Sequence, residues 1–268
     1  MNKAIRFSLI FLLIMFSFIS LSPTTGLAKE KKTKKTDISI PEHVISISKE
    51  NTYPNASEDQ EEVEPSALTK ELLQELDISV KNPDLIKMLN ETTIKPSPIA
   101  IGYRGMVYLG RWPLHYKSLE TTPNWEYQQI NTNELNNLGG EATQKLSYNQ
   151  DEQKEVKGAL TSKINQSDQV KKMMLLEAKA KTKLPLSYHT VIGKGTKKTN
   201  YYNVPIKKFG YLHSYAPAIN ERGQVTFGEV YLQLKGSKKE IVIKNVTKQG
   251  IGAWIPIQDH LSFTFRLN

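Results

Sequence analysis

The C-terminal stretch I-Q-D-H-L-S-F-T-F-R-L, residues 257–267, alternates apolar and polar side chains. Its apolar members all occupy odd positions: Ile257, Leu261, Phe263, Phe265 and Leu267. Such period-2 alternation is typical of a half-buried strand with one face on a core and the other in water. Because one strand cannot pair its own backbone groups, earlier residues must supply the sheet that it joins.

Similar alternation recurs upstream, and glycines punctuate it. It appears in residues 99–109, 202–215, 225–234 and 241–246. The apolar parity changes near Lys207-Lys208 and again near Gly228-Glu229, which predicts a bulge or bend at each place. The segment from Asn220 to Gly223 has the composition of a hairpin turn.

Three segments have helical spacing instead. Leucines repeat at i, i+4 and i+8 after Pro65, and Asn82-Pro83 is a typical start of a short helix running to about Asn90. The clearest helix covers residues 167–183, with Ser167 as the expected N-cap. The fold class predicted is α+β: a mainly antiparallel twisted sheet of about eight strands, with two N-terminal helices and this longer helix packed on it.

The N-terminus has the pattern of a secretory signal. Lys3 and Arg6 precede an almost wholly apolar run, residues 7–21, and a small-residue exit ends at Ala28. The run is shorter than the roughly 20 residues of a spanning helix, which favours a signal peptide (1–28) cleaved after Ala28 over an uncleaved anchor. We therefore expect an extracytoplasmic protein, secreted or associated with the cell wall or membrane surface.

The next segment, residues 29–64, is basic and then acidic. It begins K-E-K-K-T-K-K and later gathers five carboxylates, without the spacing of a calcium loop. Its composition predicts a partly disordered arm. Residues 65–268 are expected to form a single globular domain.

Composition limits the partners. The 268-residue chain has no cysteine, which excludes disulfides, thiol chemistry and Cys–zinc sites and favours an exported protein of a Gram-positive bacterium. Its formal charge is +9. Outside the cell, the polyanions available are cell-wall polymers and anionic lipid, so nucleic acid is not expected, whereas a protein partner is possible. Alternatively, the excess lysine only keeps the protein soluble.

No reactive constellation stands out. There is no G-x-S-x-G motif, and Gly193–Lys198 lacks the spacing of a phosphate-binding loop. The histidines are widely spaced, although His189, His213 and His260 could converge from different strands. No metal, cofactor or catalytic residue is predicted. Three strand acids remain as unpaired candidates for hydrolysis: Glu126, Glu229 and Asp259.

One region mixes flat aromatic rings with arginine, and aromatic faces and cations can bind sugar rings or anionic polymers. Core packing is the alternative for its two tryptophans. The candidate ligand-binding residues are Arg104, Arg111, Trp112, His115, Tyr116, Trp125 and Tyr127.

Four segments resemble the YfkD-like proteins of Bacillus and relatives: I-S-K-E-N-T-Y-P (47–54), N-T-N (131–133), G-I-G-A-W-I-P (250–256) and Q-D-H (258–260). The resemblance covers nearly all of the chain after the signal. It implies an uncharacterised exported protein with a single domain. It transfers no catalytic residue.

Three functions follow from these observations. The leading hypothesis is a non-enzymatic exported protein that binds within the cell envelope. The alternative is a hydrolase of wall polysaccharide or peptide. The third is a membrane-active β protein built on the weakly apolar stretch 132–164, but Lys145, Lys157 and Lys163 would interrupt its lipid face.

Overall fold

The computed structural model describes residues 38–55, 62–92, 104–236 and 238–268, all of which belong to one compact unit, Thr36–Asn268. The predicted signal peptide and the lysine run after it lie outside the described residues, as do most carboxylates of the acidic segment. Within the described ranges, no helix is both long and apolar enough to cross a membrane.

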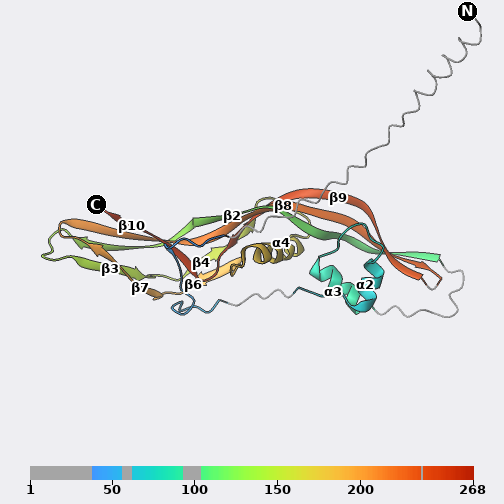
Figure 1. The fold of residues 1–268 in the computed structure, drawn as a ribbon, viewed down its shortest axis with the longest axis horizontal. Coiled ribbons are helices and arrows are strands. Elements are labelled where there is room, and N and C mark those ends of the chain that lie inside the picture. The colour runs from blue at the N-terminus through green and yellow to red at the C-terminus, as the bar shows by residue number, and fades with distance from the viewer. Residues whose placement is uncertain (1–37, 56–61, 93–103, 237) are drawn as a thin grey trace, which may run out of the picture. The chain divides into compact units, whose positions relative to one another are not determined.

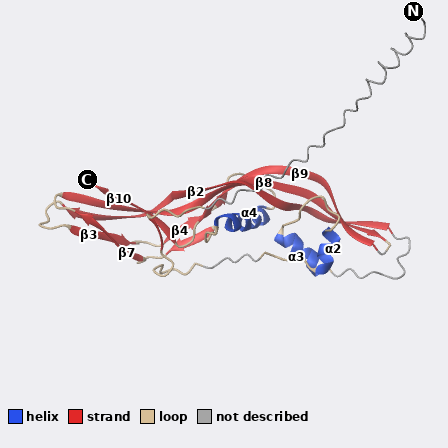
Figure 2. Cartoon of the chain, in the orientation of Figure 1, coloured by secondary structure: helices blue, strands red, loops and turns tan. Residues whose placement is uncertain are grey.

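Strands dominate the unit, as Figures 1 and 2 show. The helices are α2 (Ala67–Leu73), α3 (Pro83–Glu91) and α4 (Ser167–Thr182). The strands are β1 (Val44–Ser46), β2 (Arg104–Asn137), β3 (Gln144–Asn149), β4 (Lys154–Lys157), β5 (Ala159–Leu160), β6 (His189–Ile192), β7 (Lys197–Val204), β8 (Lys208–Lys235), β9 (Lys238–Pro256) and β10 (His260–Leu267).

Strand β8 is the centre of the main sheet. Along one side it pairs with β2, from Lys208 opposite Asn137 to Lys235 opposite Arg104. Along the other side, its first part pairs with β10 and the remainder with β9. Strands β1 and β5 add to the outer sides of β10 and β9. Every pairing is antiparallel, so the predicted α+β class with a mainly antiparallel sheet is confirmed.

Two further pairs of strands form small sheets of their own. Strand β3 pairs with β7, and β4 pairs with β6. An isolated bridge between Leu186 and Ile257 joins the chain before β6 to the chain before β10.

Bulges let the longest strand stay continuous. The pairing of β2 with β8 shifts register at five places, one of them at Gly110, whose φ of +114° is suited to glycine. The pairing of β8 with β9 shifts between Phe227 and Glu229, so the bulge predicted there is confirmed. The parity change near Lys207-Lys208 marks the turn from β7 into β8, where Lys207 has a φ of +59°.

The hairpin turn predicted at Asn220–Gly223 is wrong, because β8 runs straight through it. Asn220 pairs with Thr122 on one side and Trp254 on the other. Gly223 does not form a turn; it allows β8 to approach β2 closely. A Cβ atom there would lie 2.3 Å from the carbonyl oxygen of Lys117 and 2.4 Å from the hydroxyl of Tyr116.

Three apolar clusters fill the unit. In the first, Met173 and Met174 of α4 pack with Ile219 and Ile255 of the sheet, so the longer helix packs on the sheet as predicted. The second includes Leu146 of β3, Val204 of β7 and Phe263 of β10. The third joins Leu72 of α2 and Leu85 of α3 to Val230 and Ile241, where β8 pairs with β9.

The helix start predicted at Asn82-Pro83 is confirmed, whereas α2 begins at Ala67, two residues after Pro65. Ser66 caps α2 and Asn82 caps α3 through their side-chain oxygens. For α4, the cap predicted at Ser167 is wrong, since Ser167 is already helical. Gln166 precedes it with a left-handed φ of +52° and makes no side-chain cap bond.

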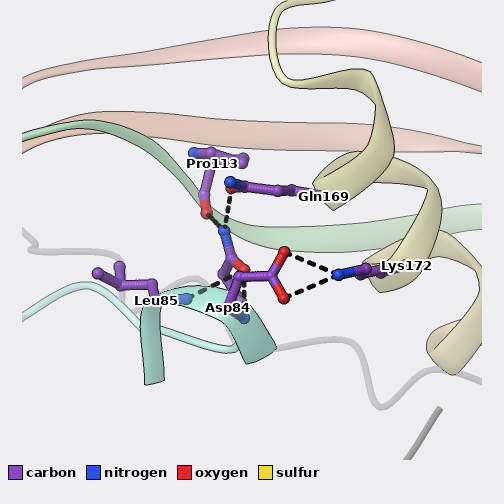
Figure 3. A network of polar contacts seen from close by, with 6 residues as sticks. Asp84, Leu85, Pro113, Gln169 and Lys172 are labelled. Carbon is purple, nitrogen blue, oxygen red and sulfur yellow. Dashed lines mark hydrogen bonds and ion pairs between the residues drawn. The ribbon is translucent and has the colours of Figure 1, made fainter. Parts of the chain in front are cut away.

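Asn82 also joins three elements through its side chain. Figure 3 shows the partners Pro113 and Gln169, together with Asp84 and Lys172. Nδ2 of Asn82 donates to the carbonyl of Pro113 at 2.7 Å and to Oε1 of Gln169 at 2.9 Å, which connects α3 to β2 and α4. Beside it, Nζ of Lys172 contacts both carboxylate oxygens of Asp84, at 2.9 and 3.0 Å. The part of β2 around Pro113 is therefore fixed against α3 and α4.

The last strand agrees with its predicted alternation only in part, since Leu267 of the predicted apolar face is 40% exposed. Leu261 and Phe263 are buried, as the alternation predicts. Ser262 is also fully buried, although it belongs to the predicted polar face; it pairs with Val44 of β1 and Tyr215 of β8. The polar residues on either side of it, His260 and Thr264, are partly exposed.

Candidate functional site: the basic end of the sheet

The seven residues that the sequence groups together all lie on β2 but do not form one site. The strand distributes them over its length and both of its faces. Tyr116 and Trp125 belong to the first apolar cluster, Tyr127 packs against the second, and Trp112 packs against the third. Arg104 and Arg111 lie together with other basic residues at the β2–β8–β9 end of the sheet.

The tryptophans and Tyr127 have structural partners. Nε1 of Trp112 donates to the carbonyl of Leu109 at 2.9 Å. The ring of Tyr127 stacks on Trp254, with centroids 5.2 Å apart. These rings contribute packing area and aromatic contacts to the fold.

Tyr116 belongs to a buried polar network around Glu221. Its hydroxyl donates to Oε1 of Glu221 at 2.8 Å, and Oγ1 of Thr121 donates to Oε2 at 2.5 Å. Nζ of Lys181 lies 2.6 Å from the hydroxyl of Ser118 in the same group. Burial raises the pKa of Glu221 although these hydrogen bonds oppose the rise, and burial likewise raises the pKa of Tyr116.

The histidines have separate neighbours. Nδ1 of His115 lies 3.1 Å from the carbonyl of Ser79. Burial is the main cause that lowers the pKa of its ring, and nearby lysines lower it further. His189 contacts Glu155, His213 contacts Thr132, and His260 contacts the carbonyl of Gln258. Among the residues that the structure describes, no group of three or more His, Asp or Glu side chains could hold a metal ion.

The three candidate acids also have separate partners, and Asp259 lies in the turn between β9 and β10 rather than on a strand. Glu126 accepts from Thr264 at 2.9 Å, and Asp259 accepts from Asn51 and Asn55 at 2.8 and 2.6 Å. Glu229 accepts from the Tyr231 hydroxyl and from Asn245, each at 2.8 Å. Both hydrogen bonds lower the pKa of Glu229, the one from Tyr231 more than the one from Asn245. This acid is therefore suited to remain ionised.

The densest gathering of charge is the face of β2, β8 and β9 opposite α2 and α3. We call it the basic face. Cross-strand pairing arranges it in four rows of three: Arg104, Lys235 and Lys238; Met106, Gln233 and Glu240; Tyr108, Tyr231 and Val242; Arg111, Glu229 and Lys244. The residues between them, such as Leu232 and Ile241, point to the other side and pack on the helices. In Figure 1, this end of the sheet extends beyond α2.

The first row places three cations side by side. Like charges directly opposite one another destabilise a sheet. Lys235 has one acidic partner, Glu240, at 3.2 Å. Within the described residues, neither Arg104 nor Lys238 forms an ion pair, and both are exposed. The row is therefore a cluster of three cations with one carboxylate partner, which a further anion would stabilise.

The centre of the basic face is aromatic. The rings of Tyr108 and Tyr231 lie 5.1 Å apart, and Nζ of Lys244 lies 5.2 Å from the centroid of Tyr231. The side chain of Lys244 also reaches Sδ of Met106, at 3.5 Å. At the fourth row, the Arg111 guanidinium donates to Oγ1 of Thr247 at 2.6 Å and to the Asn245 carbonyl at 3.3 Å. Arg111 is thus held in place by β9.

Sequence reasoning included Arg104 and Arg111 but missed the lysines and Tyr231 that complete the face. Their spacing contains the necessary signal, since Glu229, Tyr231, Gln233 and Lys235 share one parity that is opposite to that of Val230 and Leu232. What the sequence lacks is the register between strands. A shift by one residue would place the same side chains on different faces.

Two of the segments that resemble the YfkD-like family meet in space, away from the basic face. Asn51 and Asn55 both donate to Oδ1 of Asp259 and both donate to the carbonyl of Val191. The backbone N–H groups of Val191 and Gly193 donate back to Asn55 and Asn51, at 2.7 and 3.1 Å. We call this group the asparagine clasp. It joins the chain after β1 to the chains around β6 and β10.

Comparison with known proteins supports the family seen in the sequence. The family model described as "YfkD-like protein" matches residues 41–268. A protein of Bacillus subtilis (strain 168), described as "Uncharacterized protein YfkD", is 52% identical over 268 residues, which is 100% of this chain and 98% of that protein. No solved structure matches.

Proposed function

This chain belongs to the YfkD-like family, and we propose that it is a non-enzymatic binding protein of the bacterial cell envelope, exported by its N-terminal segment. Its ligands are anionic materials of the envelope. The single observation that best supports this proposal is the row of Arg104, Lys235 and Lys238, three cations on adjacent strands with one carboxylate partner among them.

The proposal is supported by electrostatics. Neighbouring cations repel one another, and a polyanion that lies across them replaces repulsion with attraction. The whole chain has an excess of basic residues, with 36 lysines and arginines against 27 acids. The excess favours association with an anionic surface, and the basic face concentrates it at one place.

Export is proposed from the sequence. Lys3 and Arg6 precede the apolar residues 7–21, and the small-residue exit follows at Ala28. The absence of cysteine fits a protein that works outside the cytoplasm without disulfides.

A fractionation and sedimentation experiment tests the proposal. We expect the chain expressed in a Gram-positive host to be recovered outside the cytoplasm, with an N-terminus near Lys29. We expect the purified chain to sediment with wall sacculi or with anionic vesicles, and salt to release it because screening weakens contacts between exposed charges. Cytoplasmic retention, or no sedimentation with either material at low salt, would refute it.

The same preparation distinguishes binding from hydrolysis. Glu126, Glu229 and Asp259 have different neighbours, so we expect no release of sugars or peptides from sacculi. Release that survives repeated purification and is lost on substituting one of these acids would favour the hydrolase instead.

A further inference from the structure

We propose that the end of the sheet formed by β2, β8 and β9 inserts into the headgroup layer of an anionic lipid bilayer. This inference rests on the proposed function and names one of its possible ligands together with the surface that binds it. The reasons are the arrangement of exposed apolar side chains among the cations and the faces from which they project.

Three consecutive residues at the start of β2 are large, apolar and exposed. The exposed fractions are 44% for Met106, 48% for Val107 and 55% for Tyr108. Leaving such side chains in water is unfavourable, whereas the boundary between headgroups and acyl chains accepts aliphatic side chains and tyrosine. Contact with lipid would therefore remove an exposed apolar surface that the fold itself leaves uncovered.

These residues project from both faces of the strand. Met106 and Tyr108 share the basic face with Gln233 and Tyr231, whereas Val107 pairs with Leu232 and points to the other side. A soluble polymer that lies along the basic face would cover Met106 and Tyr108 but not Val107. Entry of the end of the sheet into a layer of headgroups covers all three, which favours a bilayer over a wall polymer.

The cations are placed where phosphate groups would lie. Arg104, Lys235 and Lys238 form the row at the end of the three strands, and Lys244 extends over Tyr231 toward Met106. Basic residues close to an anionic leaflet each contribute to binding, and long basic side chains can keep their charge among headgroups while their stems contact apolar groups. Charge and apolar surface thus occupy the same end of the sheet, as insertion requires.

The test uses the compact unit Thr36–Asn268, which contains all three apolar clusters and lacks both the apolar N-terminal run and the lysine run after it. Vesicles of phosphatidylcholine alone are compared with vesicles of equal parts phosphatidylcholine and phosphatidylglycerol. We expect sedimentation with the anionic vesicles only. Wall sacculi serve as a third binding partner.

Charge variants locate the contact. The triple variant R104Q/K238Q/K244Q should bind anionic vesicles roughly 100-fold more weakly, because each basic residue near the surface contributes about fivefold. The control K87Q/K194Q/K197Q removes the same charge from exposed lysines of α3, the turn before β7, and β7. It should weaken binding much less. Equal weakening by both variants would overturn the proposal, because binding would then follow net charge alone.

Single cysteines report insertion, since the chain has none of its own. A polarity-sensitive fluorophore on M106C or V107C should shift to shorter wavelength with anionic vesicles. The same fluorophore on L138C, an equally exposed site in the turn between β2 and β3, should not shift. Circular dichroism of each labelled protein checks that it is folded.

The outcomes separate the two proposals. A shift at both Met106 and Val107 supports insertion of the sheet end, whereas a shift at neither overturns it. A shift at Met106 alone indicates that the basic face lies flat on the bilayer, which also overturns insertion. Binding to sacculi but not to vesicles leaves the proposed function intact and rejects this inference. Binding to neither rejects both.

Discussion

The hydroxyl of Tyr116 on β2 donates a 2.8 Å hydrogen bond to Oε1 of Glu221 on β8, a carboxylate that has no exposed surface. Burying a charge is unfavourable unless polar partners surround it. Here Tyr116 and Thr121 supply those partners from the neighbouring strand, so the two longest strands are joined by a polar contact inside an otherwise apolar layer.

Removing the Tyr116 hydroxyl should therefore destabilise the fold. Tyr116→Phe keeps the ring but takes a donor from a buried carboxylate, and we expect a loss of roughly 1.5–3 kcal/mol in the free energy of unfolding. Urea denaturation measures it. Tyr201→Phe is the control, because the Tyr201 side chain is 60% exposed, and it should change stability by less than about 0.5 kcal/mol. Equal stability of both variants would show that the Glu221 contact contributes nothing.

The pH dependence of stability should change when Glu221 is replaced. Burial raises its pKa above the ordinary value of 4.5, so the folded protein keeps this proton at pH values where the unfolded chain has lost it. Stability should therefore fall as pH rises from about 4.5 through the raised pKa and then level off. Glu221→Gln should lack this component. Urea midpoints across a pH series test this, and parallel profiles for the two proteins would contradict it.

Substituting Gly223 tests whether this position serves packing. Gly223→Ala would bring a Cβ atom to 2.3 Å from the Lys117 carbonyl, so strands β2 and β8 must separate. We expect a loss of about 2 kcal/mol or more, as for overpacked cores. Gly139→Ala, with no atom within 4 Å of its Cβ position, is the control. Thermal unfolding distinguishes the two, and tolerance of Ala at Gly223 would indicate that the strands can move apart freely.

The two helix caps should differ in importance. Ser66 donates no bond to the sheet, whereas Asn82 caps α3 and also reaches Pro113 and Gln169. Ser66→Ala should cost about 1 kcal/mol, and Asn82→Ala roughly 2–4 kcal/mol because buried partners also lose their hydrogen bonds. Chemical denaturation gives both values. The reverse order would mean that Asn82 acts only as a cap.

The asparagine clasp should control access to the N-terminal segment. Asn51→Ala removes two donated bonds, to Asp259 and Val191. It also removes three accepted bonds, from Tyr53, Gly193 and Thr196. We expect faster hydrogen exchange in β1 and easier proteolysis before residue 55, with smaller changes elsewhere. Asn203→Ala, at an exposed position of β7, is the control. Unchanged protection of β1 would show that its pairing with β10 is sufficient.

The local signals in the sequence predicted the elements well. Three features depend only on neighbours within a few residues, and the structure confirms them. They are the cap at Asn82, the helix that begins at Ser167 and the bulge at Gly228-Glu229. The error at Asn220–Gly223 has a long-range cause. Asn and Gly favour turns locally, but here the glycine makes room for Tyr116, which is more than a hundred positions away in the chain.

The basic face could be predicted only in part for the same reason. Aromatic neighbours in the sequence predict Arg104 and Arg111 as ligand-binding residues. Those neighbours, Trp112 and Tyr116, turn inward to different apolar clusters, whereas Lys235 and Lys238 arrive from the far end of β8 and the start of β9. Which side chains lie beside these arginines depends on the register between strands, and composition does not reveal that register.

The pairing of β1 with β10 joins Val44 to Ser262 and so connects the two ends of the described chain. A polypeptide is made, and threaded through any channel, from one end to the other. The sheet of this protein cannot close until β10 has emerged, and until then β8 lacks this neighbour and Asn51 and Asn55 lack Asp259. A product truncated before β10 would therefore leave one edge of β8 unpaired and open to proteases.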